Sequence, residues 1–333
     1  MLRPVAEFID AYRIWFKVTF QRGRILLTRS DSWEAFDSER LYAEPELFYS
    51  TDGHIPQVRL DETQLTPRAE VRAFSFPSPS PIASYEGTNR VSGRLYRNTS
   101  REDAPVVVLS HGWAHSGLRA LEVLFVEPLL KEGYSVAVPY HPFHFDRTPS
   151  GTFSGELMVT GDVVLTAEAF RQAAAGTIAL VNWLKASGHR RVGLLGYSLG
   201  GYIAGIVACL REDLDFVVIA AAGDSVVSPI LETGLGVNVR EDLSRSGMHR
   251  RERLERAWGI ISPGRLRLRV PTEKVLLVAG LYDRIMLSRS VGRLAERWKP
   301  AALDWAREGH YTLLARPGGL VRRAAPFMRS RSG

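Results

Sequence analysis

The stretch that decides the expected fold reads Val192-Gly193-Leu194-Leu195-Gly196-Tyr197-Ser198-Leu199-Gly200-Gly201. It begins as an apolar run typical of a buried strand, and Leu199 opens an apolar helical stretch. A serine in such a sharp strand-to-helix turn has its hydroxyl lifted out of the sheet. Gly196 and Gly200 let neighbouring backbone approach where a Cβ would clash. The pattern predicts that Ser198 is a nucleophile; the alternative is a serine that only caps a helix.

Strands and helices are expected to alternate on both sides of this turn. Apolar or alternating runs predict strands at 71–76, 91–96, 106–109, 134–139, 191–195, 216–221, 274–279 and 301–306. Helical patterns lie at 118–131, 163–187, 199–210, 288–298 and 311–328. This alternation implies βαβ units, and therefore an α/β fold with a mainly parallel, doubly wound sheet.

The rhythm of strands and helices divides the chain into three parts. Residues 1–68 form an N-terminal extension, residues 69–224 and 271–333 form the core, and residues 225–270 read as an inserted cap. In the extension, apolar side chains recur at helical spacing at Phe8, Ile9, Tyr12, Trp15, Phe16 and Thr19. That face is expected either to pack against the main domain or to meet a membrane surface, which would give peripheral membrane contact through residues 1–30.

The composition is that of a globular protein, with 333 residues, 45% hydrophobic and 24% charged. Cys209 is the only cysteine, so an internal disulfide is excluded, and a reducing, cytoplasmic location is expected. The sequence contains no run of about eighteen apolar residues, so no membrane-spanning helix is predicted. The first residues lack the clean apolar run and cleavage site of a secretory signal.

The formal net charge is +7, and arginine carries the excess. A general compositional bias explains most of it, although the basic clusters at 240–256 and 265–269 would also favour an acidic lipid headgroup or a phosphate-bearing substrate. The chain has no zinc-finger spacing, helix-turn-helix cue or aromatic RNA-binding motif, so nucleic acid is not an expected partner.

With its Gly196–Gly201 turn in this context, the segment from about 71 to 330 resembles the α/β-hydrolase superfamily. The resemblance implies an eight-stranded sheet in which only the second strand is antiparallel, and a catalytic order of Ser, acid and His. The base is then His310, in the loop after the last expected strand. The acid is Asp283, after the seventh strand, with Asp224 as a rival after the sixth; Asp304 is expected to be a surface carboxylate.

The same resemblance points to two donors for an oxyanion hole, the backbone N–H groups of Leu199 and Trp113. Trp113 follows His111-Gly112 after the third strand. This is a single glycine rather than the glycine run of some esterases, which argues against those classes. His111 itself is expected to be a buried, hydrogen-bonded support of the loop.

Residues 139–147 form an unusual loop that is rich in histidine and aromatic residues. His141, Phe143 and, from the cap, Trp258 are predicted to shape the acyl pocket. The spacing of His141, His144 and Asp146 matches no dedicated metal cage, and neither a metal nor a cofactor is expected.

Together these features predict a serine hydrolase that cleaves a small-molecule, possibly lipid-like, carboxylic ester or thioester. Ser198 would form the acyl-enzyme, His310 would act as general base and acid, and Asp283 would orient the imidazole. Two alternatives remain open: a peptidase or amidase with the same three residues, and a hydrolase-like binding protein without activity.

Overall fold

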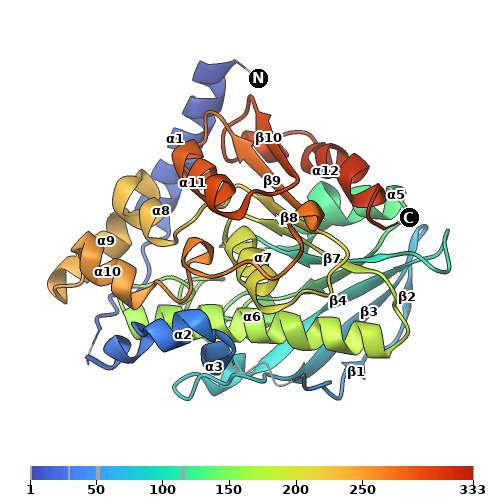
Figure 1. Ribbon diagram of the computed structural model, residues 1–333, viewed down its shortest axis with the longest axis horizontal. Helices are drawn as coiled ribbons and strands as arrows, with labels where there is room; N and C mark the ends of the chain where they lie inside the picture. Colours follow the sequence, from blue (N-terminus) through green and yellow to red (C-terminus); the bar gives the residue numbers. More distant parts are fainter. Residues whose placement is uncertain (1, 29–30, 50–52, 114–116, 333) are drawn as a thin grey trace.

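The computed structural model describes residues 2–28, 31–49, 53–113 and 117–332 (Figure 1). Its centre is a twisted, mainly parallel sheet. The strands lie in the order β3 (Ala69–Pro77), β4 (Arg90–Asn98), β6 (Ser135–Pro139), β5 (Val106–Ser110), β7 (Val192–Tyr197), β8 (Val217–Ala220), β9 (Val275–Gly280) and β10 (Ala302–Ala306). Two short strands, β1 (Arg59–Leu60) and β2 (Gln64–Leu65), pair with β3 and make the sheet ten-stranded.

The direction of the strands confirms the predicted α/β-hydrolase topology. Strand β4 runs antiparallel to both β3 and β6, whereas β6, β5, β7, β8, β9 and β10 run parallel to one another. Strands β5 to β9 are buried along their whole length, as strands covered on both faces must be. The two short strands β1 and β2 were not predicted, because two residues carry no periodic pattern.

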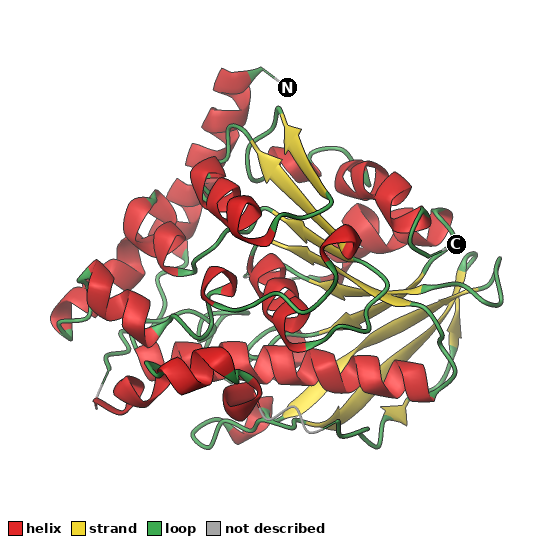
Figure 2. Ribbon diagram, in the orientation of Figure 1, coloured by secondary structure: helices red, strands yellow, loops and turns green. Residues whose placement is uncertain are grey.

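Helices cover both faces of the sheet (Figure 2). On one face α6 (Val163–Ala186) packs against α7 (Leu199–Leu210), and α11 (Ser288–Trp298) packs against β9. On the other face α5 (Glu127–Lys131) packs against α12 (Gly319–Arg329); α5 continues α4 (Leu118–Leu121) through a π-helical turn. Asp162 caps α6 by accepting hydrogen bonds from the N–H groups of Val164 and Leu165.

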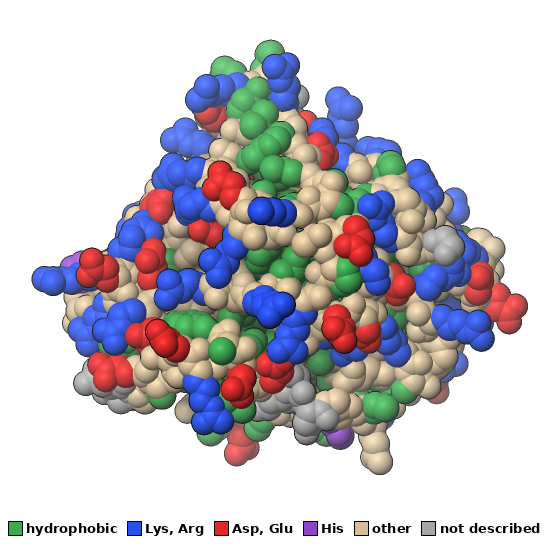
Figure 3. Space-filling view, viewed as in Figure 1, with side chains coloured by type: hydrophobic (Ala, Val, Ile, Leu, Met, Phe, Trp, Pro, Cys, Tyr) green, Lys and Arg blue, Asp and Glu red, His purple; other side chains and the backbone are tan. Residues whose placement is uncertain are grey.

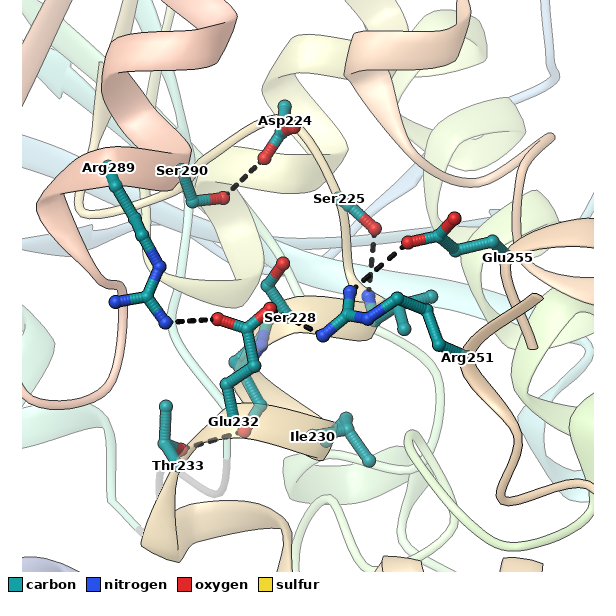
Figure 4. Close-up of polar contacts among 12 residues, drawn as sticks. Asp224, Ser225, Ser228, Ile230, Glu232, Thr233, Arg251, Glu255, Arg289 and Ser290 are labelled. Carbon is teal, nitrogen blue, oxygen red and sulfur yellow. Dashed lines mark hydrogen bonds and ion pairs between the residues drawn. The ribbon is translucent and has the colours of Figure 1, made fainter.

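The stretch predicted to be a cap is helical. It contains α8 (Val227–Glu232), α9 (Val237–Arg245) and α10 (Arg251–Ala257). Glu232 at the end of α8 bonds Arg251 of α10 at 2.6 Å and also pairs with Arg289 of α11, as Figure 4 shows. These ion pairs link α8 to α10 and to α11.

Before the sheet, the chain forms α1 (Arg3–Phe20) and the short helices α2 (Glu39–Ala43) and α3 (Glu46–Tyr49). Helix α1 lies across the end of the molecule that carries α8 and α11 (Figure 1). It is the longest helix before α6, yet within the described residues no helix is long and apolar enough to cross a membrane.

Helix α1 does not use its aromatic face for packing. Ala6 and Asp10 are its buried residues, whereas the exposed fractions of Phe8 and Trp15 are 71% and 54%. The prediction that the aromatic face packs against the main domain is therefore wrong. The opposite face, which includes the charged residue Asp10, is the one that faces the core.

Candidate active site

Ser198 occupies a strained turn between β7 and α7. Its φ of 57° and ψ of −119° place it among the few non-glycine residues with positive φ in the described part of the chain. A Cβ on Gly200 would lie 1.9 Å from the carbonyl oxygen of Ser110, and one on Gly196 would lie 2.2 Å from that of Gly200. Only glycine fits at either position, because backbone atoms cannot move aside cheaply. The turn thus holds Ser198 at the carboxyl edge of the sheet.

His310 and Asp283 complete a hydrogen-bonded series with this serine. The distance from His310 Nε2 to Ser198 Oγ is 3.0 Å, and the distance from His310 Nδ1 to Asp283 Oδ2 is 2.8 Å. The other carboxylate oxygen, Oδ1, accepts the N–H groups of Ile285 and Met286 at 2.8 and 2.7 Å. Since Asp283 accepts the proton on Nδ1, Nε2 is left with a lone pair that faces the serine hydroxyl. That is the arrangement in which an imidazole can remove the serine proton.

The two other candidate carboxylates face elsewhere. Asp224 accepts from Ser290 Oγ at 2.5 Å (Figure 4) and pairs with Arg293 at 2.7 Å, so it anchors α11. Asp304 pairs with Arg323 at 2.8 Å on the surface. Neither is placed to orient His310.

A third acidic residue, Asp10 of α1, touches both loops of the series and was not singled out from the sequence. Its carboxylate accepts the N–H groups of His310 at 2.7 Å, Tyr311 at 3.0 Å and Arg284 at 3.2 Å. The side chain is fully buried, and burial raises the pKa of Asp10, although the backbone N–H of His310 opposes that shift. Asp10 therefore joins the loop that carries the acid to the loop that carries the base.

No local sequence signal could have revealed this role. Asp10 and His310 are 300 residues apart, and an acidic residue in an amphipathic helix normally faces water.

A cavity of about 480 Å³ opens in front of Ser198. It is mainly apolar, and its lining includes Leu124, Val159, Phe170, Ile230, Leu235 and Leu314 from the core and the cap. Trp113, Leu199 and Trp258 also line it, so the predicted oxyanion donors and one of the predicted pocket residues lie at the site. Leu199 is the first residue of α7, and its N–H is among those without an acceptor inside the helix.

His141 and Phe143 do not line this cavity, so the prediction that they shape the acyl pocket is wrong. His141 is buried, with Nε2 at 3.0 Å from Ser110 Oγ and its backbone N–H donated to His111 Nε2 at 3.1 Å. Phe143 is buried edge-on against Tyr85, with ring centroids 5.2 Å apart. Both side chains are buried and support the loop instead of lining the cavity.

A buried arginine explains why the 139–147 loop turns inward. Arg147 donates to the carbonyl oxygens of Tyr140 and Thr88, each at 2.5 Å, and to Gln172 Oε1 at 2.7 Å. Its burial lowers the pKa of the guanidinium to about 9. These bonds draw the loop onto α6, away from the cavity.

The histidines of this loop also have structural partners. His111 Nδ1 donates to the carbonyl oxygen of Gly112 at 2.8 Å, because Nε2 is already an acceptor, and the residue supports the loop as expected. His144 Nδ1 lies 2.8 Å from the carbonyl oxygen of Pro142, and Asp146 accepts from Ser92 Oγ at 2.7 Å. Within the described ranges, no three His, Cys, Asp or Glu side chains are grouped to hold a metal ion.

Comparison with known proteins agrees with this architecture. Residues 95–233 match the family model described as alpha/beta hydrolase domain containing 18. An uncharacterized protein of Mycobacterium tuberculosis is 28% identical over 291 residues, covering 83% of this chain and 68% of that protein. A second, from another strain, is 31% identical over 232 residues, covering 68% of this chain and 54% of that protein. The chain thus spans about half the length of the second relative.

Several solved structures that align with this chain are esterases by name. Acetyl xylan esterase 1 from Thermoanaerobacterium aligns with a TM-score of 0.64 at 17% identity, over 94% of this chain and 97% of that one. An esterase from Pyrococcus furiosus aligns with a TM-score of 0.53 at 19% identity, over 84% and 98% of the two chains. With the strand order, these matches show that the chain has the α/β-hydrolase fold, as the description of the matched family model also indicates.

Proposed function

We propose that this protein is a serine hydrolase that cleaves a carboxylic ester or thioester. The observation that carries the proposal is the series Ser198 Oγ, His310 and Asp283, hydrogen-bonded at 3.0 and 2.8 Å and opening on a mainly apolar cavity. A free serine hydroxyl is a weak nucleophile, and an imidazole held in one tautomer by a carboxylate is what activates it.

In the first half of the reaction, Ser198 Oγ attacks the carbonyl carbon while its proton passes to His310 Nε2. The resulting oxyanion would be held by the N–H groups of Leu199 and Trp113. Collapse of the tetrahedral intermediate breaks the bond to the alcohol or thiol, which takes the proton from His310. Water, deprotonated by His310, then attacks the acyl-serine and releases the acid and free Ser198.

An ester or thioester fits the cavity better than a peptide. An aminopeptidase-like site would need carboxylates for the substrate amine, and the described residues that line the cavity include no Asp or Glu. Glu156 accepts the N–H groups of Arg24 and Phe153, and Asp162 caps α6. An acylaminoacyl peptidase does align, with a TM-score of 0.50, but over only 41% of that chain.

Labelling with a fluorophosphonate probe tests the proposal directly. The folded wild-type protein should be labelled at Ser198, and Ser198→Ala should not be labelled. The wild type should hydrolyse p-nitrophenyl butyrate faster than an aminoacyl-anilide. Absence of labelling in folded protein would favour the non-catalytic binding protein, and a preference for the anilide would favour the amidase.

The exposed face of α1 supports a proposal about location. Phe8, Tyr12, Trp15 and Phe20 are each more than half exposed, and Figure 3 shows hydrophobic side chains bordered by Lys and Arg at the end of the molecule where α1 lies. Aromatic side chains next to cations suit an anionic lipid surface. We therefore propose a cytoplasmic protein, in keeping with its single cysteine, that touches such a surface through residues 1–30.

Flotation with phosphatidylcholine vesicles, with and without an anionic lipid, tests the membrane contact. Wild type should float with the anionic vesicles, and Phe8→Ser/Trp15→Ser should stay in the soluble fraction. These substitutions leave Asp10 and the cavity untouched. Equal soluble fractions for the two proteins would remove the proposal.

A further inference from the structure

Helix α1 places two cationic side chains in the catalytic cavity. Arg13 and Lys17 are one helical turn apart and share a face with Ile9, and all three line the cavity with Ser198. The helix thus directs the half-buried Lys17 and the more exposed Arg13 to the edge of the site, and it presents most of its aromatic residues to the surface. For an amphipathic helix this is the reverse of the common orientation.

Neither cation forms an ion pair among the residues that the structure describes. The Arg13 guanidinium lies 4.9 Å from the centre of the Tyr311 ring. The Lys17 ammonium lies 5.4 Å from the centre of the Trp113 ring and donates to the Trp113 carbonyl oxygen at 3.4 Å, near the limit for a hydrogen bond. Aromatic faces attract a cation but leave its charge uncompensated.

Two carboxylates that share a smaller cavity with Lys17 are engaged elsewhere. Glu156 and Asp242 line a smaller cavity next to Lys17. Glu156 accepts the backbone N–H of Arg24 at 2.8 Å, and Asp242 pairs with Arg22 at 3.4 Å. The catalytic cavity therefore carries positive charge with no acidic residue in its described lining.

An unpaired cation against an apolar lining is costly for the protein alone, and this cost falls on the half-buried Lys17, since Arg13 is exposed to solvent. Burial, and to a smaller extent the charge of Arg13, lowers the pKa of Lys17 to about 8. A carboxylate or phosphate that entered the cavity would supply the missing counter-charge through charge-assisted hydrogen bonds, which are about twice as strong as neutral ones.

We propose that Arg13 and Lys17 form an anion subsite of the catalytic cavity, and that the substrate is an acyl ester with a second, negatively charged group, a carboxylate or a phosphate. The apolar lining receives the hydrocarbon part, and the two cations bind the anion. This inference rests on the proposed function of Ser198. The anion subsite would make ester hydrolysis by Ser198 selective for anionic substrates.

A matched pair of esters tests the subsite. p-Nitrophenyl pentanoate and the mono-p-nitrophenyl ester of glutaric acid differ only in a terminal methyl or carboxylate group, and a third ester ends the same chain in a phosphonate. Wild type should favour an anionic ester over the neutral one by about tenfold or more in kcat/KM, as hydrogen bonds to charged groups allow. Each anionic ester gives a ratio of its kcat/KM to that of the neutral ester, and the larger of the two ratios identifies the preferred anion, a carboxylate or a phosphate-like group.

The double variant Arg13→Met/Lys17→Met keeps apolar stems in place and removes both charges. It should lose the preference for the anionic esters, to within about twofold of parity, while hydrolysis of the neutral ester persists. Arg3→Gln is the matched control, because it removes one positive charge from an exposed position of the same helix and should keep the preference. A wild-type preference below twofold, or equal loss of all three activities in the double variant, would overturn the subsite.

Binding of hexyl phosphate and of hexanol, measured by calorimetry, separates this inference from the proposed function. Wild type should bind hexyl phosphate about tenfold or more tightly than hexanol, and the double variant should not. If no ester is hydrolysed but this difference persists, the subsite stands and ester hydrolysis is wrong. If esters are hydrolysed and the two ligands bind alike, hydrolysis stands and the subsite is wrong.

Discussion

The turn between β7 and α7 and helix α1 reach the same catalytic cavity in opposite ways. The turn holds its serine and its two space-making glycines within five consecutive residues, from Gly196 to Gly200, and stores its strain at Ser198. Helix α1 acts through single side chains, Asp10, Arg13 and Lys17, that meet residues up to 301 positions away in the sequence. The turn is thus a local design, whereas the contribution of α1 exists only once the chain has folded.

The difference separates two kinds of functional residue. Strain and close packing leave a spacing of glycines that a reader of the sequence can recognise. A carboxylate that accepts backbone N–H groups from distant loops leaves no such pattern in the sequence. Every residue except proline has a backbone N–H, so the partners cannot be recognised by their side chains. The four predictions below test each side of this comparison, beginning with the residue where the two regions meet.

The largest effect is expected for Asp283→Asn, because Asp283 orients the base that faces the turn and its loop is bonded to α1. An amide there favours the wrong tautomer of His310, so kcat should fall by about 10³–10⁴-fold with the fold intact. Asp224→Asn is the matched control and should change kcat by less than about threefold, since Asp224 only bonds α11. Equal losses in the two variants would contradict the assignment of the acid.

Next comes Gly200→Ala, which tests the local design of the turn. The new Cβ would lie 1.9 Å from the Ser110 carbonyl oxygen, and a displacement of about 1 Å costs on the order of 10²-fold in rate. Ester hydrolysis should drop at least that far, and the melting temperature should fall. Gly292→Ala in α11 has open space around its Cβ and should leave both values at or above those of wild type. A fully active Gly200→Ala would refute the strained turn.

The contribution of α1 is tested by Asp10→Ala. Three N–H groups of the acid and base loops lose their acceptor, so kcat should fall by roughly 10- to 100-fold and the free energy of unfolding by about 1–3 kcal/mol. Asp10→Asn keeps one acceptor oxygen and should lie between wild type and Asp10→Ala in kcat, with KM for a neutral ester little changed. Glu7→Gln, on the outer part of the helix, should behave as wild type. Unchanged kcat in Asp10→Ala would show that α1 does not position the catalytic loops.

The smallest effect concerns the dependence of stability on pH. Burial raises the pKa of Asp10 above 3.8 in the folded state, so the folded protein keeps this proton to a higher pH than the unfolded chain does. The contribution of Asp10 to stability therefore falls as pH rises through that window. In urea unfolding between pH 4 and pH 7, the stability of wild type relative to Asp10→Asn should decrease with rising pH. A constant or increasing difference would contradict the direction of the shift.

Most of the fold was predictable because its signals are local. The eight main strands of the core lie within two residues of their predicted bounds, as at β5 (Val106–Ser110) and β7 (Val192–Tyr197). Fully apolar runs allow few alternatives in a sheet covered on both faces. The short strands β1 and β2 escaped prediction, since each is two residues long and is defined by its pairing with β3.

The candidate site was predictable only in part. Ser198, Asp283 and His310 were expected from their order along the chain, and the structure brings them together. His141 and Phe143 were assigned to the pocket because their loop follows a strand that ends near the site, yet the bonds of Arg147 turn that loop inward. A loop's starting point is set by the strand before it, but its direction depends on what its side chains meet.

By itself, the sequence determined the order of strands and helices and the nucleophile turn, because periodicity and glycine spacing are properties of neighbouring residues. Asp283 and His310 were then singled out by the order that the resemblance to α/β hydrolases implies. Only the tertiary structure decided which face of α1 points inward, and so brought Asp10 to the catalytic loops and Arg13 and Lys17 to the cavity. The orientation of an amphipathic helix depends on the free energy of all its contacts. Here three backbone N–H groups that need an acceptor, those of His310, Tyr311 and Arg284, lie where the carboxylate of Asp10 can reach them.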